Sequence, residues 1–190
     1  MRKIILFILI LSSFAGATFA QGRPSSASST SAHQRVSVQL NNILEFTFTN
    51  TNSNKGGIVT IPFSTMHDYT QGVSTGEQEL RIRTNKKFAI GVKTSASYFD
   101  YSGAPGTAGT AMPVDSVLGV EVASNHTGGQ VLPPFGSGRY VSLSSRNLDI
   151  VNNGNLGSDQ RFSVKYKATP GISHGTGTYT VDVIFTATQQ

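Results

Sequence analysis

Residues 160–168 read QRFSVKYKA, and this stretch shows the alternation that decides the fold class. Its apolar residues share one parity: Phe162, Val164 and Tyr166. Its basic residues share the other parity: Arg161, Lys165 and Lys167. Successive side chains of a strand point to opposite faces of the sheet, so the pattern predicts a strand with one face buried and one face in solvent.

The same alternation occurs in residues 79–84, which read ELRIRT. The inward residues there are Leu80 and Ile82, and the outward residues are Arg81 and Arg83. Residues 85–87 (NKK) are typical of a turn, and a second apolar series follows: Phe88, Ile90 and Val92. Two alternating runs joined by a short polar turn predict a β-hairpin over residues 79–93.

Several other segments are typical of strands separated by turns. Short strands are predicted over residues 58–63, 117–123, 140–143 and 148–151. Pro62 limits the first of these to an edge or a strand end, because proline cannot donate to the ladder. Residues 98–113 are rich in Gly and Ala and predict a long surface loop. Residues 177–188 predict a last strand with one apolar face: Tyr179, Val181, Val183, Phe185 and Ala187.

Composition favours strands over helices throughout the chain. Only 13% of the residues are charged, 37% are hydrophobic, and 20 of the 190 residues are Gly. This hydrophobic content is sufficient for a packed core, which excludes a fully disordered chain. The pattern predicts an all-β protein: a single immunoglobulin-like or pilin-like β-sandwich over residues 35–190, with about eight or nine strands and no helix.

The first alternating segment, residues 35–48, has two interpretations. Its apolar residues share one parity: Val36, Val38, Leu40, Leu44, Phe46 and Phe48. Asn42 interrupts the series and indicates a bulge or bend. The segment is either the first strand of this domain, which its length favours, or a donor strand that completes the sheet of a neighbouring molecule through main-chain hydrogen bonds.

The N-terminus predicts export. Arg2 and Lys3 precede an apolar run over residues 4–11, and Thr18-Phe19-Ala20 forms a cleavage site before Gln21. The run is too short to span a bilayer, so we expect a signal peptide over residues 1–20 and no membrane span after cleavage. Residues 21–34 read QGRPSSASSTSAHQ and predict a Ser-rich disordered tether.

No catalytic or metal-binding constellation emerges from the sequence. The chain has no Cys, which removes thiol catalysis and the usual structural zinc sites. Its 4 His are not spaced to direct two imidazoles at one ion, and no G-x-S-x-G turn is present. The Asn-rich stretch over residues 149–159 is typical of a tight turn, with a weak cation site as the alternative. We therefore expect a protein that is not an enzyme and has no cofactor or metal.

Two groups of residues are candidates for binding a polymer. Outward basic residues predict a positive face if their strands are neighbours: Arg81, Arg83, Lys165 and Lys167. A solvated face that protects the sheet against aggregation is the alternative. Two aromatic residues of the loop YFDY, Tyr98 and Tyr101, are candidates for stacking on sugar rings.

Residues 177–183, GTYTVDV, resemble the closing strand of exported bacterial pilin-like and surface β-sandwich proteins. Similar endings occur in spore-coat-U-type fimbrial subunits and WxL-like surface domains, and residues 79–93 are similar in layout to exported proteins of this kind. The resemblance implies a non-enzymatic structural or adhesive subunit at the cell surface.

Two hypotheses on function follow. In the first, the protein is an exported subunit that associates with itself or with other surface proteins and polymerises. In the second, it is a module that binds a glycan or another anionic polymer. Either hypothesis implies an exported protein, which is extracellular or at the cell surface, with the periplasm as the alternative.

Overall fold

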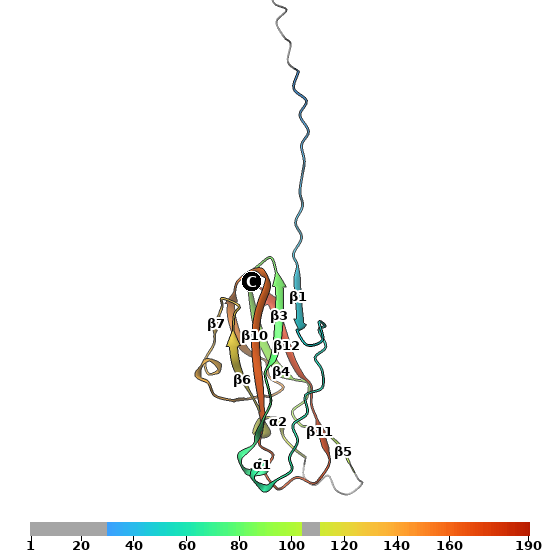
Figure 1. Ribbon diagram of the computed structural model, residues 1–190, viewed down its shortest axis with the longest axis vertical. Coiled ribbons are helices and arrows are strands. Elements are labelled where there is room, and N and C mark those ends of the chain that lie inside the picture. The colour runs from blue at the N-terminus through green and yellow to red at the C-terminus, as the bar shows by residue number, and fades with distance from the viewer. Residues whose placement is uncertain (1–29, 104–110) are drawn as a thin grey trace, which may run out of the picture. The chain divides into compact units, whose positions relative to one another are not determined.

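A computed structural model describes residues 30–103 and 111–190 (Figure 1). The predicted signal peptide and residues 21–29 of the predicted tether lie outside the described residues. The chain divides into two units, Met1–Gln39 and Leu40–Gln190. In the first unit, residues 30–39 form no strand or helix and are exposed. All the strands found among the described residues belong to the second unit.

The second unit is a β-sandwich made of two antiparallel sheets and a small third one. The larger sheet has the order β1-β3-β10-β6-β8, with β2 paired to β10. Its strands are β1 (Leu44–Phe48), β2 (Val73–Ser74), β3 (Gln78–Thr84), β6 (Leu118–Asn125), β8 (Val141–Ser142) and β10 (Gly157–Ala168). The facing sheet has the order β12-β4-β9-β7. Its strands are β4 (Phe88–Thr94), β7 (Gln130–Val131), β9 (Leu148–Gly154) and β12 (Val183–Gln189). A separate ladder joins β5 (Asp100–Ser102) to β11 (Thr178–Thr180).

The alternating residues of the sequence form the core between the two sheets. The inward side chains of β3, β4 and β10 are buried: Leu80, Ile82, Phe88, Ile90, Val92, Phe162, Val164 and Tyr166. The outward residues of β3 and β10 remain partly accessible. Burial of one face of each sheet against the other is the driving force for this layering. The expected all-β sandwich is confirmed.

The predicted hairpin over residues 79–93 is wrong. β3 pairs with β1 and β10, whereas β4 pairs with β12 and β9 in the other sheet. The turn at residues 85–87 therefore crosses from one sheet to the other. Both strands alternate because both face the same core, and alternation alone does not distinguish neighbours in one sheet from partners across a sandwich.

Three short helices also depart from the sequence prediction: α1 (Met66–Gln71), α2 (Val114–Val117) and the 3-10 turn η1 (Phe135–Ser137). A capping box begins α1, since Asp68 N donates to Thr65 Oγ1 (3.2 Å) and Thr65 N donates to Asp68 Oδ2 (2.8 Å). Hydrogen bonds from the Ser64 and Thr65 amides lower the pKa of Asp68. Among the described residues, no helix has the length and apolar character needed to cross a membrane.

The predictions for two strands, residues 58–63 and residues 177–188, are wrong in their extent. Residues 58–63 are assigned to no strand, and residues 177–188 split into β11 and β12 at Val181 and Asp182. Residues 58–63 make no main-chain hydrogen bond to a described residue, so they form no strand. Residues 177–188 pair with two different strands. The N-terminal part of the second segment pairs with β5 and the C-terminal part pairs with β4, so no single ladder contains it. The Asn-rich connection of β9 and β10 is a turn, with Asn153 at φ 56°.

One side of the sandwich is closed by the chain itself. Residues 132–140 connect β7, at the edge of one sheet, to β8, at the edge of the other. The side chains of Phe135 and Leu143 enter the core there and are 1% and 0% exposed. The Leu143 amide also donates to the Leu118 carbonyl (2.9 Å). Residues 132–140 together with Leu143, which follows β8, cover the apolar space between the sheets, and we call them the closed side.

Leu143→Ala is expected to lower the free energy of unfolding by about 2–5 kcal/mol, because it removes a buried side chain and leaves a cavity. Urea denaturation followed by circular dichroism measures this loss. The matched control is Leu156→Ala, since Leu156 is 59% exposed, and it should change stability by no more than about 0.5 kcal/mol. Equal losses in the two variants would contradict the closed side as a part of the core.

Candidate functional site

The predicted basic residues lie on one face of the larger sheet. β3 and β10 are neighbours, and Arg81 is directly opposite Arg161 in their register. The outward residues Arg81 and Arg83 of β3 therefore share this face with Lys165 and Lys167 of β10. The structure brings these four residues together as the alternation indicated. We call the surface formed by the outward side chains of β3 and β10, and by the residues that hydrogen-bond or ion-pair with them, the outer face.

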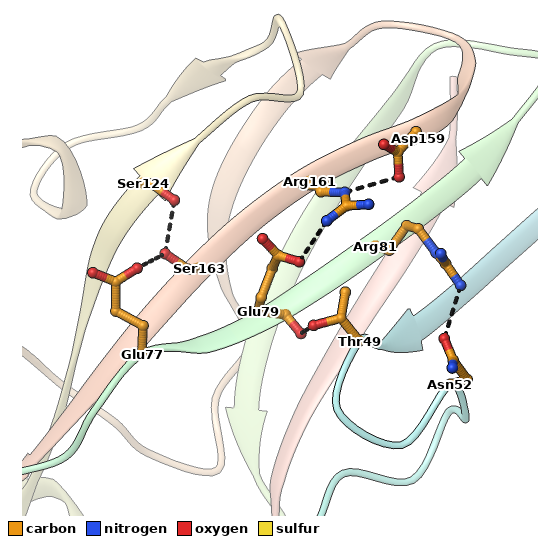
Figure 2. Close-up of polar contacts among 9 residues, drawn as sticks. All are labelled: Thr49, Asn52, Glu77, Glu79, Arg81, Ser124, Asp159, Arg161 and Ser163. Carbon is orange, nitrogen blue, oxygen red and sulfur yellow. Dashed lines mark hydrogen bonds and ion pairs between the residues drawn. The ribbon is translucent and has the colours of Figure 1, made fainter.

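Carboxylates neutralise much of the outer face. Arg83 pairs with Glu45 (3.1 Å) and Lys165 pairs with Glu77 (3.4 Å). Arg161 lies between two carboxylates, at 3.0 Å from Glu79 and 2.8 Å from Asp159 (Figure 2). The hydrogen bond from Arg161 lowers the pKa of Asp159. Alternating charges across neighbouring strands stabilise the pairing of those strands and do not form a uniformly positive surface.

A chain of hydroxyl groups continues this network toward β6. Ser163 Oγ donates to Glu77 Oε2 (2.7 Å) and lies 2.7 Å from Ser124 Oγ (Figure 2). A carboxylate only accepts, so the Ser163 proton points to Glu77 and Ser124 is the donor to Ser163. The bond from Ser163, followed by the contact with Lys165, lowers the pKa of Glu77.

The remaining cations of the outer face, Arg81 and Lys167, form no ion pair with a carboxylate of the described chain. Arg81 Nη2 donates to Asn52 Oδ1 (3.1 Å), and its Nε is buried without a hydrogen-bond partner among the described residues (Figure 2). Lys167 Nζ lies over the Tyr140 ring, 6.0 Å from its centroid. Polymer binding by Arg81, Arg83, Lys165 and Lys167 stays a prediction.

The two tyrosines of the loop YFDY occupy different environments. Tyr98 is 55% exposed. Tyr101 packs on Tyr179, with ring centroids 5.0 Å apart, and its hydroxyl donates to the Thr176 carbonyl (2.9 Å). Tyr101 therefore joins β5 to β11. Stacking of either tyrosine on a sugar stays a prediction.

The side of the sandwich opposite the closed side has a different construction, and we call it the open side. β1 and β12 are the edge strands there. Phe48 and Phe185 are in edge-to-face contact at 6.4 Å, and Gln189 Nε2 donates to the Ile43 carbonyl (2.8 Å). The inward residues are only partly buried against the core: Phe46, Phe48, Ile61, Phe63, Val181, Val183 and Phe185. No buried side chain comparable to Phe135 covers them within the described part of the chain.

Main-chain groups on the open side are also without partners. β12 pairs with β4 along one edge only. Residues 57–63 run from β1 toward α1 (Figure 1), and none of them makes a hydrogen bond to a described residue. Their side chains still alternate, with Ile61 and Phe63 packed on the core while Ile58 is 98% exposed. An apolar edge with free main-chain groups is the usual template for addition of a strand.

The segment before β1 has the same alternation but pairs with no strand of the described chain, and its Asn41 carbonyl accepts a hydrogen bond from Asn85 Nδ2 (2.8 Å). Residues 35–48 do not form one strand, because only Leu44–Phe48 pairs with β3. Residues 36–42 have no regular structure, and the exposed fractions of Val36, Val38 and Leu40 are 78%, 78% and 84%. The sequence could not show where pairing ends. The sequence feature nearest to this boundary is the interruption of the apolar series at Asn41-Asn42. The next residue, Ile43, donates its amide to Asn85 Oδ1 (3.0 Å), and β1 begins after it.

Comparisons with known proteins give no family. No family model matches the chain, and no curated protein matches it. The chain is similar to a solved chaperone-usher pilus structure, at 12% identity and a TM-score of 0.42 over 86% of this chain and 100% of that one. It is also similar to the P pilus rod subunit PapA, at 12% identity and a TM-score of 0.35 over 76% and 99% of the two chains. Because both TM-scores are below 0.5, these likenesses carry no argument here. The resemblance to spore-coat-U-type and WxL-like proteins stays a prediction.

Glu77→Gln is expected to reduce the acid dependence of stability. A carboxyl whose pKa is lowered in the folded state stabilises the fold above its ordinary pKa of 4.5, and this contribution is lost as the pH falls below that value. The variant should be less stable than the parent at neutral pH, and the difference should disappear in acid. Urea denaturation over a pH series measures it. Glu121→Gln is the control, on β6, which pairs with β10. This variant should lose as much stability between neutral pH and acid as the parent does.

Proposed function

We propose that the protein is an exported, non-enzymatic structural subunit that assembles by strand addition. In this assembly, residues 36–42 of one copy add to the free edge of β12 in another copy and cover its open side. The contrast between the two sides of the sandwich is the observation that supports the proposal. Phe135 and Leu143 seal the closed side, whereas the open side has partly exposed apolar residues and unpaired main chain.

The chemistry of the donor segment suits the edge that receives it. Val36, Val38 and Leu40 would point inward onto the partly buried residues of the open side, while Ser37 and Gln39 would point to solvent. β12 has 7 residues, which a short extended segment can follow along its whole length. Main-chain hydrogen bonds would supply affinity, and the alternating side chains would fix the register.

Burial of apolar side chains provides enough free energy for such an association. Moving one exposed Val or Leu side chain into an apolar site contributes about 1.5–3 kcal/mol. Three such residues, together with the newly covered apolar residues of the acceptor, exceed the lower estimates of the cost of association, about 4 kcal/mol. Ordering of this exposed segment opposes association, so its length and apolar content together decide the affinity.

The export and surface location of this proposal rest on the predicted signal peptide over residues 1–20 and the tether over residues 21–34. The role that we propose at the surface is structural or adhesive, and the domain over residues 35–190 is the unit that we expect to be displayed. The glycan-binding alternative has less support, because carboxylates pair with Arg83, Arg161 and Lys165 on the outer face.

Val38→Asp is expected to abolish assembly of the mature chain. A carboxylate placed against the open side would be desolvated without a partner, and a penalty of a few kcal/mol corresponds to a loss of about 100-fold in affinity. Size-exclusion chromatography and electron microscopy at increasing protein concentration measure assembly. The stability of the isolated variant should be unchanged, because Val38 is 78% exposed.

Gln39→Asp is the matched control, since it introduces the same charge one residue away on the outward parity. It should assemble like the parent chain. Equal assembly by the parent and both variants would exclude residues 36–42 as the donor. A parent chain that stays monomeric at high concentration would refute the polymerising subunit itself.

A further inference from the structure

The two ends of the sandwich carry opposite charge. At one end lie α1, β5 and β11 (Figure 1), within loops over residues 64–72, 95–103, 111–116 and 169–182. These loops contain four aspartates and no Lys or Arg: Asp68, Asp100, Asp115 and Asp182. Asp68 caps α1, whereas the other three are exposed and form no ion pair with a described residue. We call this the acidic end.

The acidic end also has a depression that apolar and polar side chains line together. A depression of about 530 Å³ lies between α1 and residues 169–174, and α2 contributes to its wall. Met66 and Ile172 line it and are 67% and 69% exposed. Apolar side chains this exposed around a concave surface are typical of a contact site for another protein.

The depression continues from the open side. Residues 57–63 lead directly into α1, and the Phe63 ring contacts the Tyr69 ring at 5.4 Å. Tyr69 lines the large depression and also a smaller adjoining one of about 270 Å³, which includes Ser64 and Ile172. A strand added along the whole of β12 would therefore reach the acidic end, where this depression lies.

The opposite end carries positive charge and its own exposed apolar residues, and we call it the basic end. The turn over residues 85–87 contains Lys86 and Lys87, which are exposed and make no ion pair with a described residue. Leu156 belongs to the β9–β10 turn at this end, because Gly157 is opposite Thr84 in the register, and it is 59% exposed. The chain that follows residues 36–42 enters β1 here, where Leu44 is opposite Thr84.

We infer that the depression at the acidic end is the docking surface for the basic end of a second copy of this chain. The inference rests on the proposed strand addition and adds a second contact to it. Leu156 and the neighbouring apolar residue Ile43, which is 61% exposed, would face Met66 and Ile172. Lys86 and Lys87 would face Asp100, Asp115 and Asp182, which gives charge complementarity across the contact.

The direction of the added strand decides whether these ends meet. β12 runs from the acidic end at Val183 to the basic end at Gln189, which lies opposite Phe88. If residues 36–42 run antiparallel to β12, residue 42 lies at the acidic end of the acceptor, and the basic end of the donor follows it there. If they run parallel, two basic ends meet, with Lys86 and Lys87 of both copies repelling one another. Charge therefore favours the antiparallel direction, which produces an open head-to-tail chain of subunits.

Charge reversal tests the contact between the ends. The variant Lys86→Glu/Lys87→Glu is expected to slow assembly about tenfold or more at low salt, and so is Asp100→Lys/Asp115→Lys/Asp182→Lys, because like charges then meet. The variant that carries both sets should recover assembly, since complementarity is restored with the signs exchanged. Lys55→Glu/Arg139→Glu, on exposed residues outside the loops of both ends, is the control and should assemble like the parent.

The apolar part of the contact has its own pair of variants. Ile172→Ser should weaken assembly without loss of stability, because Ile172 is already 69% exposed. Ile58→Ser is the matched control at a residue that is 98% exposed and lies outside the depression. Equal assembly by Ile172→Ser and Ile58→Ser would overturn the assignment of the depression.

Cysteine trapping tests the direction of the strand, since the chain has no Cys of its own. In mixtures of single-cysteine variants, the antiparallel direction predicts disulfides between Val36→Cys and Ala187→Cys and between Leu40→Cys and Val183→Cys. Disulfides in the exchanged pairs, Val36→Cys with Val183→Cys and Leu40→Cys with Ala187→Cys, would place the two basic ends together and overturn the inference.

A peptide separates failure of this inference from failure of the proposed function. The peptide VSVQLNN, residues 36–42, is uncharged. Its acceptor is the full mature chain with Val36→Asp/Val38→Asp/Leu40→Asp, which cannot donate. If the charge reversals leave peptide binding unchanged but alter assembly, the result supports both strand addition and the docking surface. If the peptide binds and assembly is unchanged by the charge reversals, the docking surface alone is overturned. If the peptide does not bind and the parent chain does not assemble, both the docking surface and the proposed strand addition are overturned.

Discussion

The free edge of β12 is the constraint on which the rest of the structure depends. A sandwich is stable when both openings between its sheets are covered, and this chain covers one opening with its own residues 132–140. On the other side, Val183 and Phe185 remain only partly buried although they face the core. Residues 57–63 retain the alternation of a strand but have no hydrogen-bonded neighbour among the described residues. The domain therefore has a buried core, whereas main-chain groups along one edge of β12 and in residues 57–63 have no strand partner among the described residues.

Charge is distributed so that it does not compete with this apolar side. On the outer face, carboxylates lie beside Arg83, Arg161 and Lys165, and these ion pairs join β1, β3 and β10 laterally. Each exposed pair contributes little to stability by itself, but together they leave only part of the face positive. Further charges without an ion pair to a described residue lie at the ends, with Lys86 and Lys87 at the basic end and three exposed aspartates at the acidic end. An arrangement of this kind gives a subunit a direction along its strands, and a polymer needs such a direction.

Much of the fold could be predicted from alternation because alternation reports which face of a strand is buried. Leu80, Ile82 and Phe162 were expected to face the core and are at most 1% exposed. Alternation does not report which strand is the neighbour, so the hairpin over residues 79–93 was assigned to one sheet and belongs to two. The same ambiguity affected residues 35–48, where one pattern covers both a paired strand and an unpaired segment.

The sequence by itself determined the all-β class, the inward and outward faces of the long strands and the absence of thiol chemistry, because these follow from local periodicity and from residue counts. Only the tertiary structure decided that β12 has a free edge, that acids lie beside the basic residues, and that the three exposed aspartates share one end. These features depend on segments far apart in the chain, such as residues 64–72 and 169–182. Local pattern carries no information about such contacts, since they arise only when the two sheets close on each other.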